Sequence, residues 1–218
     1  MAPTREQLVE LTKDPVAFLT SDDPILARMA TTALTPSQAS ENTEALMDLT
    51  LDNEPSVRAA AAEKLGSCGS EALGTLGDLE RDPDPTVREA LATAYGEIDS
   101  AHTVVWLSSA ARGDSDRHVK EAATAALGAI GNNAGIETLL LLINDGPPQV
   151  RRRAIAAITV FDDERVEPAI RRAALDRNPG VREAAEMVVG KQLTVDSGTR
   201  PSDEHPSSEP YQEESLEV

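Results

Sequence analysis

The sequence predicts an all-α solenoid of about six two-helix repeats, and three observations support this fold class. A motif of about fifteen residues recurs at a nearly constant interval, its apolar positions have helical spacing, and turn-forming residues separate successive copies. A period of about 30 residues is typical of stacked supersecondary units, because a single globular core imposes no such repeat. The clearest copy is residues 52–66, DNEPSVRAAAAEKLG.

Each copy is identified by an aspartate, here called the anchor, that is followed six residues later by a basic residue. The six anchors lie at intervals of 30, 30, 32, 31 and 31 residues, so that the units cover most of the chain. The anchors and their basic residues are Asp22/Arg28, Asp52/Arg58, Asp82/Arg88, Asp114/Lys120, Asp145/Arg151 and Asp176/Arg182.

Helix boundaries can be predicted relative to the anchors. Four anchors are followed three residues later by a proline, which is favoured in the first turn of a helix because it has no N–H to leave unpaired. A glycine fourteen residues after four anchors predicts a helix end in the left-handed conformation. The prolines are Pro55, Pro85, Pro148 and Pro179, and the glycines are Gly66, Gly96, Gly128 and Gly190.

The apolar residues of each copy lie on one stripe of a helix of about three turns. They are found five, eight, nine, twelve and thirteen residues after the anchor, and most are alanine, which lets helices approach closely. In the second unit they are Val57, Ala60, Ala61, Lys64 and Leu65. A second apolar segment of two to three turns separates consecutive copies, at residues 45–51, 72–79, 104–111, 136–143 and 166–175.

The composition favours an aliphatic, helical core in a reducing compartment. Of 218 residues, 40% are hydrophobic, but Trp 1, Tyr 2 and Phe 2 add up to only five aromatic residues. The single cysteine, Cys68, cannot form an intramolecular disulfide. The first ten residues contain no apolar run of signal-peptide length, and no apolar stretch is long enough to span a bilayer. We therefore expect a cytoplasmic protein.

The net charge of −18 is unevenly distributed along the chain. Residues 1–144 carry 10 basic and 23 acidic side chains, residues 145–191 carry 9 and 8, and residues 192–218 carry 1 and 7. A negative surface repels phosphate backbones and anionic lipids. The charge therefore argues against nucleic acid and membranes as partners.

The recurring pattern D-x-x-P-x-V-R-x-x-A-x-x-x-L-G, as in residues 52–66 and 82–96, resembles the HEAT repeat. The short period is similar to that of the phycobilisome-lyase-like (E-Z type) HEAT subclass. The resemblance covers roughly residues 5–191. It implies a right-handed, armadillo-type α-solenoid whose second helices line a concave surface, which such proteins usually use to bind another macromolecule.

The recurring Asp and Arg residues are interpreted as structural. An aspartate in a turn can accept hydrogen bonds from the amides of that turn and from an arginine of its own or an adjacent unit, and the pairs would then form a ladder along the stack. A catalytic pair has no reason to appear in every repeat. The six anchor pairs given above are the predicted ladder.

The resemblance also suggests which side chains face the groove. Residues seven after the anchor should point away from the apolar stripe, and a second row runs beside them. The predicted protein-binding residues are Glu63, Glu89, Thr93, Glu121, Thr124, Arg152, Arg153, Glu183 and Glu186. Most of this surface is acidic, with a basic end at residues 151–153, and a negative groove suits a protein partner.

Arg153 occupies a position where four other units have alanine, and two interpretations of the arginine cluster stay open. As a functional feature, Arg152 and Arg153 would form a clamp for carboxylates or other anions, because guanidinium groups suit bidentate contacts. As a structural feature, Arg151 belongs to the ladder, Arg152 is solvated, and Arg153 extends along the edge of the stripe.

No metal or catalytic constellation is predicted. The three histidines, His102, His118 and His205, are not spaced as zinc ligands from one another or from Cys68. Deoxyhypusine hydroxylase, which is built from similar repeats, holds iron with His-Glu pairs, whereas Thr103, Val119 and Pro206 follow the histidines here. Phycobilin lyases resemble the chain only in repeat type, and a shared fold does not carry over chromophore chemistry.

The last residues differ from the repeats. Residues 194–218 are rich in serine, proline and acidic side chains and have too little apolar surface to offset the entropy of ordering. We therefore predict a solenoid at residues 1–193 and a disordered acidic tail at 194–218. The expected function is a non-catalytic protein-binding scaffold or adaptor without a cofactor. The alternative is an enzyme or enzyme-assembly factor of the phycobilin lyase or deoxyhypusine hydroxylase-like type.

Overall fold

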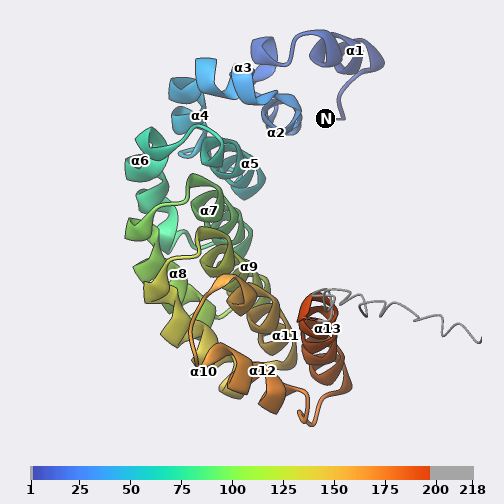
Figure 1. Cartoon of the computed structure of the whole chain (residues 1–218). Coiled ribbons are helices and arrows are strands. Elements are labelled where there is room, and N and C mark those ends of the chain that lie inside the picture. The colour runs from blue at the N-terminus through green and yellow to red at the C-terminus, as the bar shows by residue number, and fades with distance from the viewer. Residues whose placement is uncertain (1, 197–218) are drawn as a thin grey trace, which may run out of the picture.

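The structure, a computed structural model, describes residues 2–196, and side chains are described for residues 2–190. Within this range the chain is helical and contains no strand, which confirms the predicted all-α solenoid. The helices stack in two layers along a curved path (Figure 1). The inner, concave layer holds α2 (Pro24–Ala33), α5 (Pro55–Gly66), α7 (Pro85–Ile98), α9 (Arg117–Ile130), α11 (Pro148–Ala157) and α13 (Pro179–Asp196).

The outer layer consists of shorter helices. It contains α3 (Pro36–Glu41), α4 (Thr43–Leu49), α6 (Leu73–Asp78), α8 (Val104–Gly113), α10 (Ile136–Asp145) and α12 (Val166–Ala173). All of these helices except α3, which was not predicted, fall on the predicted second apolar segments. The chain opens with α1 (Arg5–Lys13) and a short 3-10 turn, η1 (Val16–Phe18). Further 3-10 turns flank the outer helices: η2 (Ser70–Ala72), η3 (Leu79–Arg81), η4 (Ala101–Thr103), η5 (Asn133–Gly135) and η6 (Ile158–Val160).

The inner helices begin as the sequence predicts. Proline is the first residue of α5, α7, α11 and α13. In α7 the Asp84 side chain accepts a hydrogen bond of 2.8 Å from the Thr86 amide, and in α9 Asp116 accepts one of 2.7 Å from the His118 amide. These caps satisfy amides that have no partner inside the helix, which fixes the start of each helix.

The alanine-rich stripe forms a continuous core along the stack. In α5 the side chains of Val57, Ala61 and Leu65 are completely buried, and the equivalent residues of α7 and α9 are buried as well. Lys64, on the same stripe, is half-buried, and its ammonium donates a hydrogen bond of 2.8 Å to the carbonyl oxygen of Leu34. Each inner helix therefore buries its stripe against the units on either side of it, as expected for a repeat array.

The predicted role of the glycines as left-handed helix ends is wrong. Gly96 and Gly128 lie inside α7 and α9; Gly66 is the last residue of α5, as predicted, but like the other two it has no positive φ. A Cβ on Gly128 would lie 2.7 Å from the Cα of Ala157 on the next inner helix, and one on Gly96 would lie 3.1 Å from the Cα of Ala126. Glycine is needed at these positions because the neighbouring helix leaves no room for a side chain.

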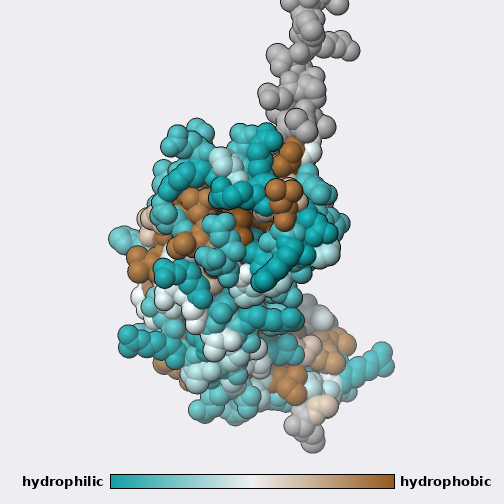
Figure 2. Space-filling view, turned by 90° about the horizontal axis from the view of Figure 1, so that it is seen from below, coloured by the Kyte–Doolittle hydropathy of each residue, from teal (hydrophilic) through white to brown (hydrophobic). Residues whose placement is uncertain are grey.

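The last unit has no inner helix stacked beyond it in the described chain. A Cβ on Gly190 would meet no atom of the described residues within 4 Å, although this glycine is equivalent to the crowded ones. Leu175 and Met187 of this unit are 85% and 59% exposed. Seen from the α12 end, the molecule shows hydrophobic patches on a mostly hydrophilic surface (Figure 2).

The predicted boundary between solenoid and tail falls inside a helix. The tail was expected from residue 194, whereas α13 continues to Asp196. The remainder of the predicted tail, residues 197–218, lies outside the described residues. Among the described helices, none combines the length and the hydropathy needed to cross a membrane.

The glycine contacts lead to a pair of opposite predictions for one substitution. Gly128→Ala should destabilise the protein by roughly 1–3 kcal/mol, because the new methyl group overpacks against the backbone of α11. Gly190→Ala should stabilise it by up to about 1 kcal/mol, because alanine is the better helix former and the site is open. Urea unfolding followed by far-UV circular dichroism measures both. Equal effects at the two sites would contradict the crowding explanation.

Candidate protein-binding groove

Arginines tie consecutive turns of the stack together. The Nε and Nη2 groups of Arg58 donate to the two carboxylate oxygens of Asp82, at 2.8 and 3.0 Å, while Nη1 donates to the carbonyl oxygen of Asp52 at 2.8 Å. Arg88 repeats the arrangement with Asp114, at 2.8 and 2.9 Å, and with the carbonyl oxygen of Asp82 at 2.7 Å. Each arginine thus links its own anchor to the anchor of the next unit, and such a link is here called a rung.

A third rung joins Arg151 to Asp176. Nη2 of Arg151 donates to the carboxylate at 2.8 Å, and Nη1 donates to the carbonyl oxygen of Gly146 at 2.7 Å. The arginine is only 4% exposed, and its Nε has no hydrogen-bond partner among the described residues. Asp176 also accepts a bond from the amide two residues further on, as Asp52, Asp82 and Asp114 do.

Two basic residues of the predicted ladder, Arg28 and Lys120, form no rung with the anchor of the next unit. Among the described residues, neither Arg28 with Asp52 nor Lys120 with Asp145 comes within ion-pair distance. Pro24 follows its anchor Asp22 by two residues rather than three, so that Arg28 stands one position further along its helix than the other arginines. One residue of helix corresponds to a rotation of about 100°, which turns Arg28 away from the edge of the stack where the anchors lie. Arg182, in the last unit, donates to the carbonyl oxygen of Asp176 at 2.8 Å.

The rungs shift the pKa values of the aspartates. The hydrogen bond from Arg88 lowers the pKa of Asp114 below its ordinary value of 3.8, against the opposing effect of burial. For Asp82 burial is the largest effect and raises the pKa, but hydrogen bonds from Arg58 and from the Asp84 amide together outweigh it and leave the pKa lowered. The anchors of the rungs are therefore held in the charged form.

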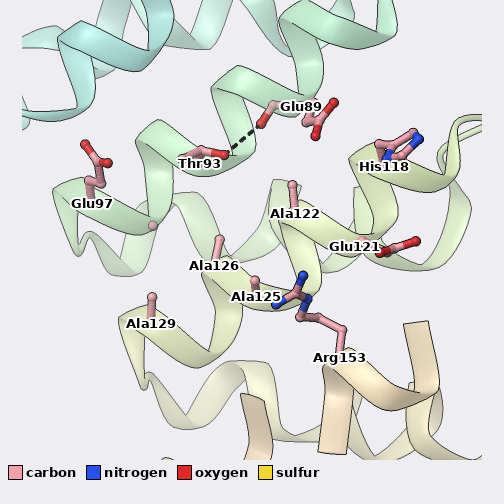
Figure 3. A pocket seen from close by; sticks show the side chains of 11 residues that line it. Glu89, Thr93, Glu97, His118, Glu121, Ala122, Ala125, Ala126, Ala129 and Arg153 are labelled. Carbon is pink, nitrogen blue, oxygen red and sulfur yellow. Dashed lines mark hydrogen bonds between the residues drawn. The ribbon is translucent and has the colours of Figure 1, made fainter. Parts of the chain in front are cut away.

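The inner helices form a hollow of about 460 Å³ where α7, α9 and α11 meet (Figure 3). Its floor is made of alanines from α9, together with Gly96. Acidic residues stand around it: Glu89 and Glu97 come from α7, and Glu121 comes from α9. Arg153 reaches across from α11 so that its guanidinium lies near Ala125.

A second hollow, of about 480 Å³, lies between α2, α5 and α7. Its walls include Arg28 and Thr32 from α2 and Glu63 from α5, and Glu89 and Thr93 line both hollows. The two hollows therefore form one continuous surface on the concave side, here called the groove. The structure places Glu63, Glu89, Thr93, Glu121 and Arg153 of the predicted set in the walls of the groove.

Thr124 does not face the groove. It is completely buried, and its hydroxyl donates a hydrogen bond of 2.7 Å to the carbonyl oxygen of Lys120. It stands ten residues after its anchor, whereas Glu63 and Thr93 stand eleven residues after theirs. The prediction is wrong because a shift of one residue turns the side chain by about 100°. Ala125 occupies the corresponding position in the groove.

The remaining predicted residues lie toward the end of the stack. Arg152, Glu183 and Glu186 are exposed on α11 and α13, outside both hollows. Glu186 stands ten residues after its anchor, like Thr124, but no inner helix covers it in the described chain.

Sequence reasoning missed several residues of the groove: Arg28, Thr32, Ser56, Thr86, Glu97 and His118. Ser56, Thr86 and His118 all stand four residues after an anchor, so that a full count of helical positions would have found them. Arg28 and Thr32 would have been found by counting from Pro24 instead of from Asp22. In the part of the chain that the structure describes, no group of three or more His, Cys, Asp or Glu side chains is placed to hold a metal ion.

The comparison with protein families decides the classification. The family model for HEAT repeats matches residues 73–143 and 136–197, which is more than half of the chain. The chain belongs to the HEAT-repeat family. The predicted membership is therefore confirmed, whereas the assignment to the phycobilisome-lyase-like subclass stays a prediction. The search of curated proteins found no match for this HEAT-repeat chain.

Solved structures share the HEAT-repeat fold. The Escherichia coli protein YibA is 18% identical over 89% of this chain and 80% of its own, with a TM-score of 0.65. An engineered protein is 19% identical over 85% of this chain and 97% of its own, with a TM-score of 0.55. Human deoxyhypusine hydroxylase, solved in complex with glycerol, is 16% identical over 81% of this chain and 82% of its own. Its TM-score of 0.43 is too low to support an argument about this chain. Identities this low show the fold alone.

Removing a rung should weaken the HEAT stack in a pH-dependent way. Arg88→Gln leaves Asp114 buried without its partner, which should cost roughly 2–3 kcal/mol at neutral pH. Because the folded-state pKa of Asp114 lies below the unfolded value, the stabilisation is complete above about pH 4 and is lost as the pH falls through the folded-state pKa. The difference between variant and wild type should therefore shrink at pH 3.

Urea unfolding at neutral pH and at about pH 3 measures this difference. The matched control is Lys120→Gln, which removes the basic residue from the equivalent position, where no rung forms. A loss of stability that is equal for the two variants, or that does not change with pH, would contradict the assigned role of the rung.

Proposed function

We propose that this HEAT-repeat chain is a non-catalytic protein-binding scaffold or adaptor that holds a basic segment of another protein in its groove. The observation that carries the proposal is the arrangement of Glu63, Glu89, Glu97 and Glu121 along the inner helices. Among the described side chains, none of these carboxylates forms an ion pair with a basic residue. Their negative charge is therefore available to a partner.

The floor of the groove supports a binding role. Alanine and glycine side chains leave room above α9 for the side chains of a ligand, while the glutamates stand at the rim of the hollow. A lysine or arginine of a partner would bury its apolar stem on the alanines and place its charge between the carboxylates. The inner helices are already folded before a partner binds, so that most of the cost of ordering the backbone falls on the partner.

The strength of such binding depends on several weak contacts acting together. An exposed ion pair contributes roughly 0.2–1 kcal/mol, so that one glutamate alone cannot hold a partner. A row of carboxylates also raises the association rate of a basic partner, an effect that falls as salt is added. We therefore expect affinity that decreases with ionic strength.

The Thr93 hydroxyl is a groove hydroxyl that is engaged with the backbone. It donates a hydrogen bond of 3.2 Å to the carbonyl oxygen of Glu89, one turn earlier in α7 (Figure 3). Activation as a nucleophile would instead require a hydrogen bond to a general base such as a carboxylate or imidazole of the hollow. We further propose, from the charge and composition, that the partner is a protein rather than nucleic acid or a membrane, and that the location is cytoplasmic.

The competing proposal is an enzyme or enzyme-assembly factor of the phycobilin lyase or deoxyhypusine hydroxylase-like type. It differs in a direct observable, because such a protein would carry iron or a coloured cofactor. Elemental analysis and the visible absorption spectrum of protein purified from its native host test it. Stoichiometric iron or an absorption band would favour this alternative over the scaffold.

Charge reversal in the groove should abolish capture of the partner in a pull-down. In the variant Glu89→Lys/Glu121→Lys, the loss of two pairs worth roughly 0.2–1 kcal/mol each should lower affinity about two- to thirtyfold, and repulsion from the two new lysines should lower it further. A tagged pull-down from the native host, read by mass spectrometry, identifies the partner. Calorimetric titration with that partner at two salt concentrations then measures the affinity.

The matched control is Glu71→Lys/Asp78→Lys. Both residues are exposed in the outer layer, and their reversal changes the net charge by the same amount. The control should retain the partner, and all variants should keep wild-type helicity. An unchanged affinity of the groove variant, or equal losses in both variants, would contradict the placement of the binding site.

A further inference from the structure

The contact between α9 and α11 differs from the other contacts between inner helices. Rungs link α5 to α7, α7 to α9, and α11 to α13 at the edge where the anchors lie, here called the turn edge. Between α9 and α11 the corresponding residues are Lys120 and Asp145, and within the described residues they form no ion pair. Asp145 is the last residue of α10, and its side chain is exposed.

Two residue choices account for the missing rung. In the other turns an amide two residues after the anchor donates to the anchor carboxylate, as the Asp84 amide does to Asp82 at 2.9 Å. After Asp145 that position is Pro147, which has no N–H. Lys120 carries a single ammonium group instead of the planar fork with which Arg58 and Arg88 hold both carboxylate oxygens. Neither the carboxylate of Asp145 nor the ammonium of Lys120 is therefore held in place for a rung.

The contact between α2 and α5 also lacks a rung, but another bond links these helices. The Lys64 ammonium of α5 donates a hydrogen bond of 2.8 Å to the carbonyl oxygen of Leu34, the residue that caps α2. No equivalent hydrogen bond joins α9 to α11 among the described residues. The turn edge is thus unlinked at both contacts, but among the described residues only the contact between α9 and α11 has neither a rung nor another hydrogen bond between its inner helices.

The opposite edge of the same contact is held tightly. A Cβ on Gly128, near the end of α9, would lie 2.7 Å from the Cα of Ala157, the last residue of α11. In the outer layer Arg165, just before α12, forms an ion pair with Glu137 at the start of α10. Both contacts lie where the inner helices end and the outer helices begin. The two units are therefore joined at one edge and unlinked at the other.

The concave side of this contact also differs in composition from the contacts nearer the start of the stack. The position eight residues after the anchor is a buried alanine in α5 and α7, Ala60 and Ala90, but it is the exposed Arg153 in α11. The hollow of Figure 3 lies at this place, with Glu121 on the α9 side and Arg153 on the α11 side. Motion between the two helices would change the separation of these side chains.

We propose that the contact between α9 and α11 is a hinge within the solenoid. The units up to the one formed by α9 and α10 make one segment, and α11 to α13 make the other. The two segments rotate relative to each other about the close approach of Gly128 and Ala157. Rotation opens the turn edge between Lys120 and Asp145 and alters the width of the groove between Glu121 and Arg153. The hinge follows from the packing alone and does not depend on the proposed partner.

Distance measurements between spin labels test the hinge. The spin labels are attached at exposed positions that lie four residues after an anchor. The native cysteine is first removed by the substitution Cys68→Ser. The pair Thr86→Cys/Gln149→Cys spans α7 to α11 and includes the hinge. The control pair Ser56→Cys/His118→Cys spans α5 to α9 across two rungs. Double electron–electron resonance should give a broader distance distribution for the first pair than for the control.

Restoring the rung should narrow the distribution. The variant Lys120→Arg/Pro147→Asn supplies the guanidinium fork and changes the turn to Asp-Gly-Asn-Pro, similar to Asp-Arg-Asn-Pro at residues 176–179. In this variant the Thr86/Gln149 width should fall to that of the control. Conversely, Arg88→Lys should broaden the Ser56/His118 distribution. Equal widths of the two pairs in the parent protein, or a width that the restored rung leaves unchanged, would overturn the hinge; circular dichroism establishes that each variant is folded.

Discussion

The close approach of neighbouring inner helices is the constraint on which the rest of the structure depends. At three successive contacts a glycine of one helix faces an alanine of the next: Gly66 faces Ala94, Gly96 faces Ala126, and Gly128 faces Ala157. Small residues are required there because any larger side chain would push the helices apart. The same requirement makes the floor of the groove alanine and glycine, so that the binding surface follows from the packing of the stack. The acidic rows stand above this floor and touch little of the core.

The arginine rungs complete the stack at its turn edge. They bury guanidinium and carboxylate groups together and satisfy the carbonyl oxygens and amides of the turns, so that few polar groups are left without a partner. A buried ion pair of this kind contributes less to net stability than to fixing one arrangement of the units. Packing therefore sets the distance between helices, while the rungs set their orientation. Where Lys120 and Pro147 interrupt the rungs, only the distance is set.

The sequence was sufficient to predict the fold, because period, prolines and alanine stripe all gave the same answer. It was insufficient where burial depends on the neighbouring unit. A glycine fourteen residues after an anchor is consistent with a helix end and with a close contact to the next helix. For Gly128 only the position of Ala157 in the structure distinguishes these two roles. Thr124 and Arg28 were misplaced for a different reason. A helical count that is wrong by one residue moves a side chain from the surface into the core, or from one face of the helix to another.

The last inner helix carries a charge at a position that is buried in the interior units. Ala62, Ala92 and Thr124 are completely buried there, whereas Glu186 on α13 is exposed. A second molecule stacking end to end on α13 would have to strip water from this carboxylate, at a cost of several kcal/mol unless its own surface supplied a basic partner. Repeat proteins are liable to polymerise because their ends resemble their interiors. A single glutamate thus acts against growth of the described solenoid into a filament, even though the adjoining surface retains the glycine of a stacking unit.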